Sequence, residues 1–343
     1  MSGLDVAIAI VTYKSADLTI DCLRSVEAER ASSSLQIVAI VVDNASGDAP
    51  AIASAIEKHG WSSWVNLVVA PMNGGFAYGN NLAIQEANRI GPPRFVHLLN
   101  PDTLVRKRAI EALVDFFRLH SEVGIAGGSF ENVDGSDWPL AFRFPTALGE
   151  LEAGLQFGLA TKILRPWVVV EKKMTPVAQP IDWVAGASMM VRWNLIERIG
   201  GFDENYFLYF EETEFCYRAR KHGFATWYVP SSRVMHIAGH STKVTWRDAR
   251  PKRLPPYWFE SRRRFFMTTY GLPYAVLTDL VAITAIGLGS LKRRFQGRKN
   301  CGIPSLASDM LRYSVLWRRN RQIPAIKALN LSSEVPNYGH ARN

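Results

Sequence analysis

Residues 37–48 read IVAIVVDNASGD, a run of apolar and β-branched residues that closes on Asp43 and a turn composition. A continuous apolar run of this length is typical of a strand that is buried on both faces, as in a parallel sheet. A second run of the same kind, VAIAIV at 6–11, lies upstream, and a stretch with helical spacing separates the two. Together they predict the first strand–helix–strand unit of an α/β fold.

The alternation of strands and helices continues to residue 120, which predicts a mostly parallel central sheet flanked by helices. Ligands of such sheets bind at the carboxyl ends of the strands, where this pattern places Asp43 and Asp102. Strands are expected at 6–11, 37–42, 65–70, 95–99, 224–229 and 234–237, helices at 17–29, 51–59, 80–89 and 109–120, and a Gly/Asn loop at 73–81. The apolar segments at 182–191 and 195–199 are expected to belong to the core.

The charge is unevenly distributed along the chain. The formal net charge is +9, and residues 250–327 hold 16 Lys and Arg residues against three acidic ones. A mildly acidic body is therefore followed by a basic region, which suits an anionic membrane surface, a phosphorylated substrate or a nucleic acid. Residues 273–291 are uncharged except for Asp279, and we expect a helix that lies on a membrane or packs on the domain rather than one that spans.

The cysteine content and the N-terminal sequence indicate in which cellular compartment the protein is expected. The three cysteines, Cys22, Cys216 and Cys301, are too scattered for a disulfide framework or a zinc site of paired cysteines. The opening residues MSGLDVAIAIVTYK have neither a basic segment nor a cleavage site typical of a secretory signal. A reduced, cytosolic protein is expected.

Each motif that bears on chemistry has an ordinary structural alternative. Asp43 can accept a hydrogen bond from a nucleotide base or simply cap a turn. The loop around Gly75 lets the backbone approach a phosphate, or is an ordinary loop between a strand and a helix. Asp102, in the sequence Asn100-Pro101-Asp102, can hold a divalent ion or belong to a turn.

The acidic motif and His236 likewise have both a functional and a structural interpretation. Glu211, Glu212 and Glu214 lie among aromatic residues, which would desolvate a carboxylate and raise its pKa, as suits a general base. Glutamates are also favoured at a helix N-terminus by the helix dipole. His236 is either a metal ligand or a core histidine.

The order of these motifs is more specific than any one of them. In this order the chain resembles the family 2 glycosyltransferases of the GT-A fold, in the rhamnosyltransferase-like and galactofuranosyltransferase-like branch, over roughly residues 5–245. The motifs that carry the resemblance are Thr12-Tyr13, Asp43-Asn44, Asn73-x-Gly75-Phe76, Asn100-Pro101-Asp102, Trp183-Val184-x-Gly186-Ala187, Gly201-Phe202-Asp203-Glu204, Phe210-Glu211-Glu212 and His236.

The resemblance implies a role for each matching position. Glu212 would be the catalytic base, with Glu211 as the other candidate. Asp102 and His236 would hold Mg²⁺ or Mn²⁺, although Asn100 stands where the family's motif has its first aspartate. The donor nucleotide would be bound by Thr12, Tyr13, Asp43, Asn73, Gly75, Phe76, Asn80, Asn100 and Asp102. The acceptor would be bound by Trp183, Gly186 and Ala187.

Arg262, Arg263 and Arg264 are expected to join the acceptor site. They alternate with aromatic residues, and arginines bind phosphates by paired hydrogen bonds. We therefore expect them to recognise the diphosphate of a lipid-linked acceptor and to dock the protein on the membrane. A solvated arginine face of a surface helix is the alternative.

The resemblance implies an inverting, metal-dependent glycosyltransferase of the bacterial cell wall or a polysaccharide pathway, located in the cytoplasm and peripheral on the inner face of the membrane. The donor is a nucleotide sugar, with dTDP-L-rhamnose as first choice, and the acceptor is a saccharide or a polyprenyl-diphosphate-linked saccharide. No nucleic acid partner is expected, and a homo-oligomer is possible. A nucleotidyltransferase is disfavoured because its Gly-rich loop would follow the first strand, and a non-catalytic sugar-nucleotide or nucleic-acid binding protein is the other alternative.

The expected organisation has two parts. Residues 1–249 would form the GT-A catalytic domain, with a nucleotide-sugar half at 1–125 and an acceptor half at 126–249. Residues 250–343 would form a basic, partly hydrophobic helical region that contacts a membrane or another subunit.

Overall fold

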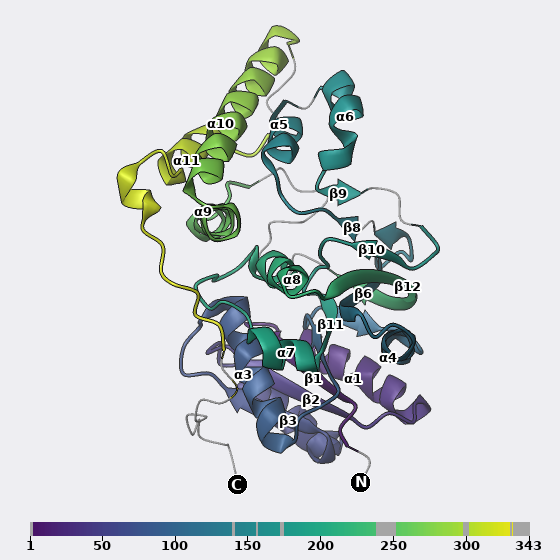
Figure 1. The fold of residues 1–343 in the computed structure, drawn as a ribbon. Helices are drawn as coiled ribbons and strands as arrows, with labels where there is room; N and C mark the ends of the chain where they lie inside the picture. Colours follow the sequence, from purple (N-terminus) through teal and green to yellow (C-terminus); the bar gives the residue numbers. More distant parts are fainter. Residues whose placement is uncertain are drawn as a thin grey trace.

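The fold was analysed in a computed structural model, which describes residues 3–138, 141–155, 157–171, 175–237, 252–297, 302–329 and 331. A central sheet occupies one part of the molecule and a group of helices rises from it (Figure 1). The order of its main strands is β10-β12-β6-β11-β4-β1-β2-β3, with β5 paired to β12 and β7 paired to β6. The strands are β1 Val6–Thr12, β2 Ile37–Asp43, β3 Val65–Val69, β4 Phe95–Leu99, β5 Thr103–Val105, β6 Val123–Glu131, β7 Asp137–Trp138, β10 Gln179–Ile181, β11 Ser188–Arg192 and β12 Ala225–His236.

The first half of the sheet is parallel, as the alternation of strands and helices requires. Strand β1 pairs in parallel with both β2 and β4, and β2 pairs in parallel with β3. Strand β11 then enters antiparallel between β4 and β6, while β6 and β12 are again parallel to each other. Strands β8 (Ala141–Phe142) and β9 (Val170–Glu171) form a separate small sheet.

Helices cover both faces of the sheet because successive strand residues point to opposite faces. Val6, Ile8 and Ile10 pack with helices α1, α2 and α4, whereas Ala7 and Ala9 pack with α3, α7 and α8. These helices are α1 Ala16–Ser32, α2 Ala49–Lys58, α3 Gly75–Ile90, α4 Ala109–Leu119, α7 Trp193–Ile199 and α8 Glu211–Lys221, and the short 3₁₀ turn η1 spans Trp61–Ser63.

The remaining helices form a layer beyond α8 (Figure 1). Phe265, Phe266 and Ala275 are buried in the same core as α8, so the basic region packs directly onto the part of the molecule that contains the sheet. Gly289 lies so close to Gly154 that a Cβ there would be 2.3 Å from the Gly154 carbonyl oxygen. The elements are α5 Ala147–Leu155, α6 Gly158–Leu164, η2 Arg165–Trp167, α9 Pro256–Tyr270, α10 Leu272–Phe295, α11 Leu306–Tyr313 and η3 Arg318–Arg321.

The main deviations from the predicted elements concern where helices and strands begin and one register shift within a strand. Helix α3 begins at Gly75, five residues earlier than predicted, so most of the expected Gly/Asn loop is helical. The predicted strands at 224–229 and 234–237 are one strand, β12, with a register shift between Val229 and Arg233. The segment 182–191, which was expected to belong to the core, forms a strand only from Ser188. Local propensity does not encode such bulges and helix starts.

Candidate active site

The ends of β1 and β2 hold two of the predicted nucleotide-site residues side by side. Thr12 and Asp43 are register partners and both are buried. The Thr12 hydroxyl donates to Asp48 at 3.1 Å. Asp43 accepts hydrogen bonds from the Ser46 amide at 2.8 Å and from the Ala49 amide at 3.0 Å. Asp43 therefore caps its own turn, and its contact with a nucleotide base stays a prediction.

The predicted donor loop is tied to the segment that precedes the acidic motif. The Asn44 side-chain amide donates to Asn73 Oδ1 at 3.0 Å and to the Gly75 carbonyl at 3.1 Å. Gly75 has φ +87°, and a Cβ there would lie 2.0 Å from the Phe207 carbonyl oxygen. The next amide, that of Phe76, donates to the same Phe207 oxygen at 2.9 Å. Glycine is required here both for φ and for the close approach.

A second contact joins the donor loop to the predicted acceptor site. A Cβ at Gly186 would lie 2.8 Å from the Phe76 ring, so this ring packs directly on the glycine. The Gly186 amide donates a hydrogen bond to the Glu212 carboxylate. The Asn100 amide donates to the Ala187 carbonyl at 3.1 Å. Residues from all three predicted groups, donor, acceptor and catalytic, are thus brought together.

Three further predicted residues line or support this region. Trp183 stacks on Phe142 with ring centroids 4.0 Å apart, and its indole N–H donates to the Arg143 carbonyl at 3.0 Å. Tyr13 is exposed at the end of β1. Asn80 lies inside α3, where its side-chain amide donates to the Phe76 carbonyl at 2.9 Å. Asn80 therefore supports the helix start in this structure, and its contact with a nucleotide stays a prediction.

Asp102 and His236 meet at the same edge of the sheet. His236 Nε2 lies 3.3 Å from Asp102 Oδ1, and both side chains are largely buried. The Ile237 amide donates to the Asp102 carbonyl, and the His236 ring stacks on Trp138. A carboxylate oxygen and an imidazole nitrogen are donors that fit a divalent cation such as Mn²⁺. No group of three such side chains exists among the described residues, so substrate oxygens would have to complete the coordination.

The two glutamates at the start of α8 are the strongest electrostatic feature of the site. Burial, and then the neighbouring Glu212 charge, raises the pKa of Glu211 well above its ordinary value. Burial also raises the pKa of Glu212, while the hydrogen bond from Gly186 acts in the opposite direction. Within the described residues, Oε2 of each glutamate has no hydrogen-bond partner. Two adjacent buried carboxylates cannot both ionise at low cost, so one of them retains a proton more readily than the other.

The backbone before these glutamates is unusual. Tyr209 has φ +71° and Phe210 has φ +69°, although neither is glycine. Non-glycine residues seldom adopt this left-handed conformation, and such residues gather at functional sites. The two residues place Glu211 at the first position of α8, directly after the turn.

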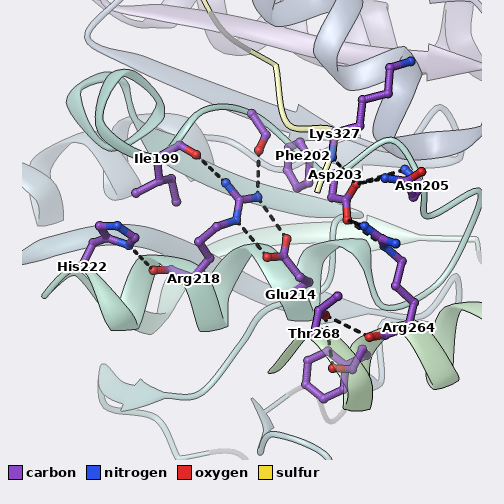
Figure 2. Close-up of polar contacts among 12 residues, drawn as sticks. Ile199, Phe202, Asp203, Asn205, Glu214, Arg218, His222, Arg264, Thr268 and Lys327 are labelled. Carbon is purple, nitrogen blue, oxygen red and sulfur yellow. Dashed lines mark hydrogen bonds and ion pairs between the residues drawn. The ribbon is translucent and has the colours of Figure 1, made fainter. Parts of the chain in front are cut away.

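Glu214, the third glutamate of the acidic motif, does not belong to the site. Arg218 donates to Glu214 at 2.8 Å and also to the carbonyls of Ile199 at 2.6 Å and Gly201 at 2.9 Å (Figure 2). This arginine fastens α8 to the end of α7. Glu211 and Glu212 therefore stay the two candidates for proton transfer.

The predicted phosphate-binding role of Arg262, Arg263 and Arg264 is wrong for two of the three. Arg262 is buried and forms ion pairs with carboxylates on α5 and α10. Arg264 is buried against Asp203 (Figure 2). Arg263 is half-buried and donates to the Tyr313 carbonyl at 3.1 Å. The charged groups of Arg262 and Arg264 face the protein interior because other elements cover α9 on several sides. The spacing of the arginines in the sequence does not predict this burial.

Four residues to which the sequence analysis assigned no role help to position the site. Asn44 and Asp48 hold the donor side, as described above. The Asn81 side chain forms two hydrogen bonds with the backbone of Phe202. Its Oδ1 accepts from the Phe202 amide and its Nδ2 donates to the Phe202 carbonyl, each at 2.9 Å. Asp203 is fully buried. Asn44 and Asp48 follow a strand, where Asp and Asn are ordinary turn residues. Asn81 lies within α3 and Asp203 follows α7, so neither is indicated by a position after a strand.

Residues 4–252 match the family described as glycosyltransferase like family 2, which is most of the chain. The chain belongs to this family. It is a glycosyltransferase, and its strand order and flanking helices are those of a GT-A fold. The family and fold expected from the sequence are thereby confirmed.

The curated relatives of this glycosyltransferase include rhamnosyltransferases. The N-acetylglucosaminyl-diphospho-decaprenol L-rhamnosyltransferase of Mycobacterium tuberculosis is 29% identical over 215 residues, which cover 59% of this chain and 67% of that protein. Rhamnosyltransferase WbbL of Escherichia coli K12 is 25% identical over 49% of this chain and 63% of its own length. The low-salt glycan biosynthesis hexosyltransferase Agl10 of Haloferax volcanii is 30% identical over 63% of this chain and 62% of its own length.

Solved structures with the same fold extend the comparison. The mannosyltransferase PcManGT from Pyrobaculum calidifontis, solved with GDP-Man and Mn²⁺, aligns with a TM-score of 0.51 at 14% identity, over 92% of this chain and 81% of that one. GalNAc-T7, solved with UDP, GalNAc and Mn²⁺, aligns with a TM-score of 0.52 at 13% identity, over 87% of this chain and 55% of that one. At this identity the likeness supports the fold alone.

Proposed function

We propose that this glycosyltransferase inverts the anomeric carbon and uses Glu212 as its base. The observation that carries the proposal is the pair of buried glutamates at the start of α8, one of which accepts a hydrogen bond from Gly186. The Gly186 amide favours the ionised form of Glu212, so Glu211 is the member that retains the proton. Glu212 is then the carboxylate that can accept one.

The reaction would be a single displacement. The acceptor hydroxyl oxygen attacks the anomeric carbon while its proton passes to Glu212, and the bond from that carbon to the diphosphate oxygen breaks. The nucleoside diphosphate leaves with the bonding electrons. One base and one displacement invert the configuration, and no second carboxylate is needed as a nucleophile.

Asp102 and His236 would hold a divalent ion, Mg²⁺ or Mn²⁺. The two structural neighbours named above were solved with Mn²⁺, and the donor atoms of this pair fit such an ion. When bound, the ion would supply Lewis-acid stabilisation of the charge on the leaving diphosphate. The protein's own part is to hold the two side chains together at the end of β12 and beside β5.

The donor and acceptor are proposed from the relatives. The first choice of donor is dTDP-L-rhamnose, because two of the curated relatives are named rhamnosyltransferases. The acceptor would be a saccharide or a polyprenyl-diphosphate-linked saccharide, since the mycobacterial relative is named for such a substrate. An acceptor of this kind would place the enzyme on the cytoplasmic face of the membrane.

The test is a panel of donors with wild type and the Asp102→Ala variant. Binding and hydrolysis of dTDP-rhamnose, UDP-galactose, UDP-N-acetylglucosamine and GDP-mannose would be measured with and without Mn²⁺. Metal-dependent turnover of one donor that Asp102→Ala abolishes supports the proposal and identifies the sugar. NMR of the product decides the stereochemistry, and retention at the anomeric carbon would overturn the single-displacement mechanism.

A further inference from the structure

Helix α10 presents different residues on its two sides. One side is buried and lined mainly by small residues, among them Ala275, Ala282, Ala285 and Gly289. The opposite side carries large apolar residues at spacings of three, four, seven or eight residues, so they share one face. These residues are exposed, from 49% for Leu277 to 83% for Phe295, and the stripe consists of Leu277, Leu280, Leu288, Leu291 and Phe295.

The buried side of α10 is held by charge, which shows that protein rather than lipid surrounds it there. Asp279 forms an ion pair with Arg262 at 2.6 Å and accepts from the Val315 amide at 2.8 Å. Among the described residues, α10 is the one helix long and apolar enough to cross a membrane, yet a third of its apolar window is buried in the protein. A buried ion pair in the first half of the helix suits a helix fixed to the domain rather than one that spans a membrane.

Exposed apolar residues at the start of α6 adjoin the exposed apolar residues at the C-terminal end of α10. The Lys292 ammonium lies 4.5 Å from the centre of the Phe157 ring, so the two elements meet there. Phe157 and Leu159 are both exposed. This end of the molecule, where α5, α6 and α10 rise together, is remote from strands β1–β3 (Figure 1). We call it the apical surface, defined by Phe157, Leu159, Leu288, Leu291 and Phe295.

The charge around the apical surface is mainly positive. Its one described acidic contact on α6 is Glu152 of α5, which is half-buried and accepts a hydrogen bond from the Thr161 hydroxyl at 2.7 Å. Residues 157–167 and 280–297 contain no acidic residue. Their basic residues are Lys162, Arg165, Lys292, Arg293 and Arg294. A second copy docked through the same surface would bring these cations against one another, which is unfavourable. An anionic bilayer complements both the basic residues and the apolar ones.

We propose that the apical surface docks on an anionic lipid bilayer, with Phe157, Leu288 and Phe295 entering the headgroup region and the nearby lysines and arginines contacting lipid phosphates. The exposure and the charge of this surface are independent of the proposed function. Its purpose rests on the proposed function, because a polyprenyl-linked acceptor would lie in that bilayer. This surface replaces Arg262 and Arg264 as the membrane contact, since those two arginines are buried.

Vesicle flotation of the full chain without substrates tests the proposal. Wild type should float with phosphatidylglycerol-containing vesicles and much less with pure phosphatidylcholine. The combined Leu288→Glu, Leu291→Glu and Phe295→Glu variant should bind about 100-fold more weakly, because three apolar side chains no longer enter the interface. Lys162→Gln with Arg294→Gln should weaken binding about tenfold and reduce its salt dependence.

Leu119→Glu is the matched control, because Leu119 is 82% exposed at the end of α4, away from the apical surface. It should bind vesicles like wild type, and circular dichroism should show all variants folded. Equal flotation of wild type and the triple glutamate variant would overturn the proposal. So would a wild-type dimer, seen by sedimentation without vesicles, that the triple variant dissociates. Donor turnover is measured in parallel in solution without vesicles. A failure of the proposed transfer reaction is thereby distinguished from a failure of membrane docking.

Discussion

Arg264 on α9 and Asp203, before α8, form a buried ion pair at 2.6 Å (Figure 2). Asp203 is fully buried, and its other oxygen accepts from the Lys327 amide at 2.9 Å and from the Asn205 side chain at 2.7 Å. One carboxylate thereby joins the C-terminal region to the segment that leads into Glu211. Glu211 and Glu212, the proposed catalytic pair, are thus supported by Arg264 and Lys327, which lie beyond the family match at 4–252.

Arg264→Ala should therefore destabilise the fold strongly. Removal of one partner leaves Asp203 buried without its countercharge, which typically costs about 3–5 kcal/mol. Urea denaturation followed by circular dichroism measures this loss. Arg118→Ala is the control, because its pair with Asp115 is about half exposed and should contribute at most about 1 kcal/mol. Equal losses in the two variants would contradict a structural role for the buried pair.

Glu212→Gln should abolish most of the transfer activity without preventing folding. A lost general base lowers kcat by about 10²–10⁴-fold. Glu211→Gln should keep most of the rate, because Glu211 is the protonated member of the pair and glutamine still offers a neutral hydrogen-bonding group. Steady-state kinetics with the donor found in the panel measures both. If Glu211→Gln were the inactive variant, the two roles would have to be exchanged.

The raised pKa of Glu211 predicts a pH-dependent gain in stability for Glu211→Gln. In the folded state this carboxyl keeps its proton to a higher pH than in the unfolded state. Its contribution to stability is therefore fully present below about pH 4 and declines as pH rises toward the folded-state pKa. Glu211→Gln removes that decline, so it should be more stable relative to wild type at pH 7 than at pH 4. Thermal unfolding at the two pH values checks the sign, and a constant difference would contradict it.

Asp102→Ala should weaken Mn²⁺ binding more than His236→Gln does. Asp102 supplies a charged oxygen, the ligand type that hard divalent cations prefer, whereas His236 supplies a neutral nitrogen. Calorimetric titration of Mn²⁺ in the presence of a nucleoside diphosphate measures both affinities. EDTA should remove the wild-type activity and added Mn²⁺ should restore it. Full activity after exhaustive chelation would exclude a metal at this pair.

The regular parts of the fold were predictable from the sequence because their signals are local. Strands β1, β2 and β4 read as apolar runs, and the polar residues that follow them lie at one edge of the sheet as predicted. The sequence also predicted that one carboxylate of the acidic motif would be desolvated, and Glu211 is buried with a raised pKa. Its catalytic role stays a prediction.

The orientation of the arginines on α9 was not predictable in this way. From the sequence alone, Arg262 and Arg264 are expected to be surface charges. In the fold, Arg262 pairs with Asp279 and Arg264 pairs with Asp203, and both partners are distant in the sequence. Asn44 and Asn81 likewise act through partners distant in sequence. Without an observed contact, Asn44 cannot be distinguished from any other turn residue, nor Asn81 from any other polar residue of a helix.

Gly75→Ala tests whether the donor loop and the segment before α8 must touch. The alanine Cβ would meet the Phe207 carbonyl at 2.0 Å and would also hold an unfavourable φ of +87°. Gly60→Ala is the matched control, because Gly60 has φ +69° but no atom within 4 Å of its Cβ position. The control should lose about 1 kcal/mol from backbone strain alone.

Gly75→Ala should lose that amount and about 1–3 kcal/mol more, because the clash is with backbone that can yield only by moving the Phe207 segment. That segment leads directly into Tyr209, Phe210 and Glu211, so transfer activity should fall as well, while Gly60→Ala keeps it. Urea denaturation and donor turnover are measured on both variants. If the two variants lost equal stability and Gly75→Ala stayed fully active, the contact between Gly75 and Phe207 would not position the catalytic glutamates.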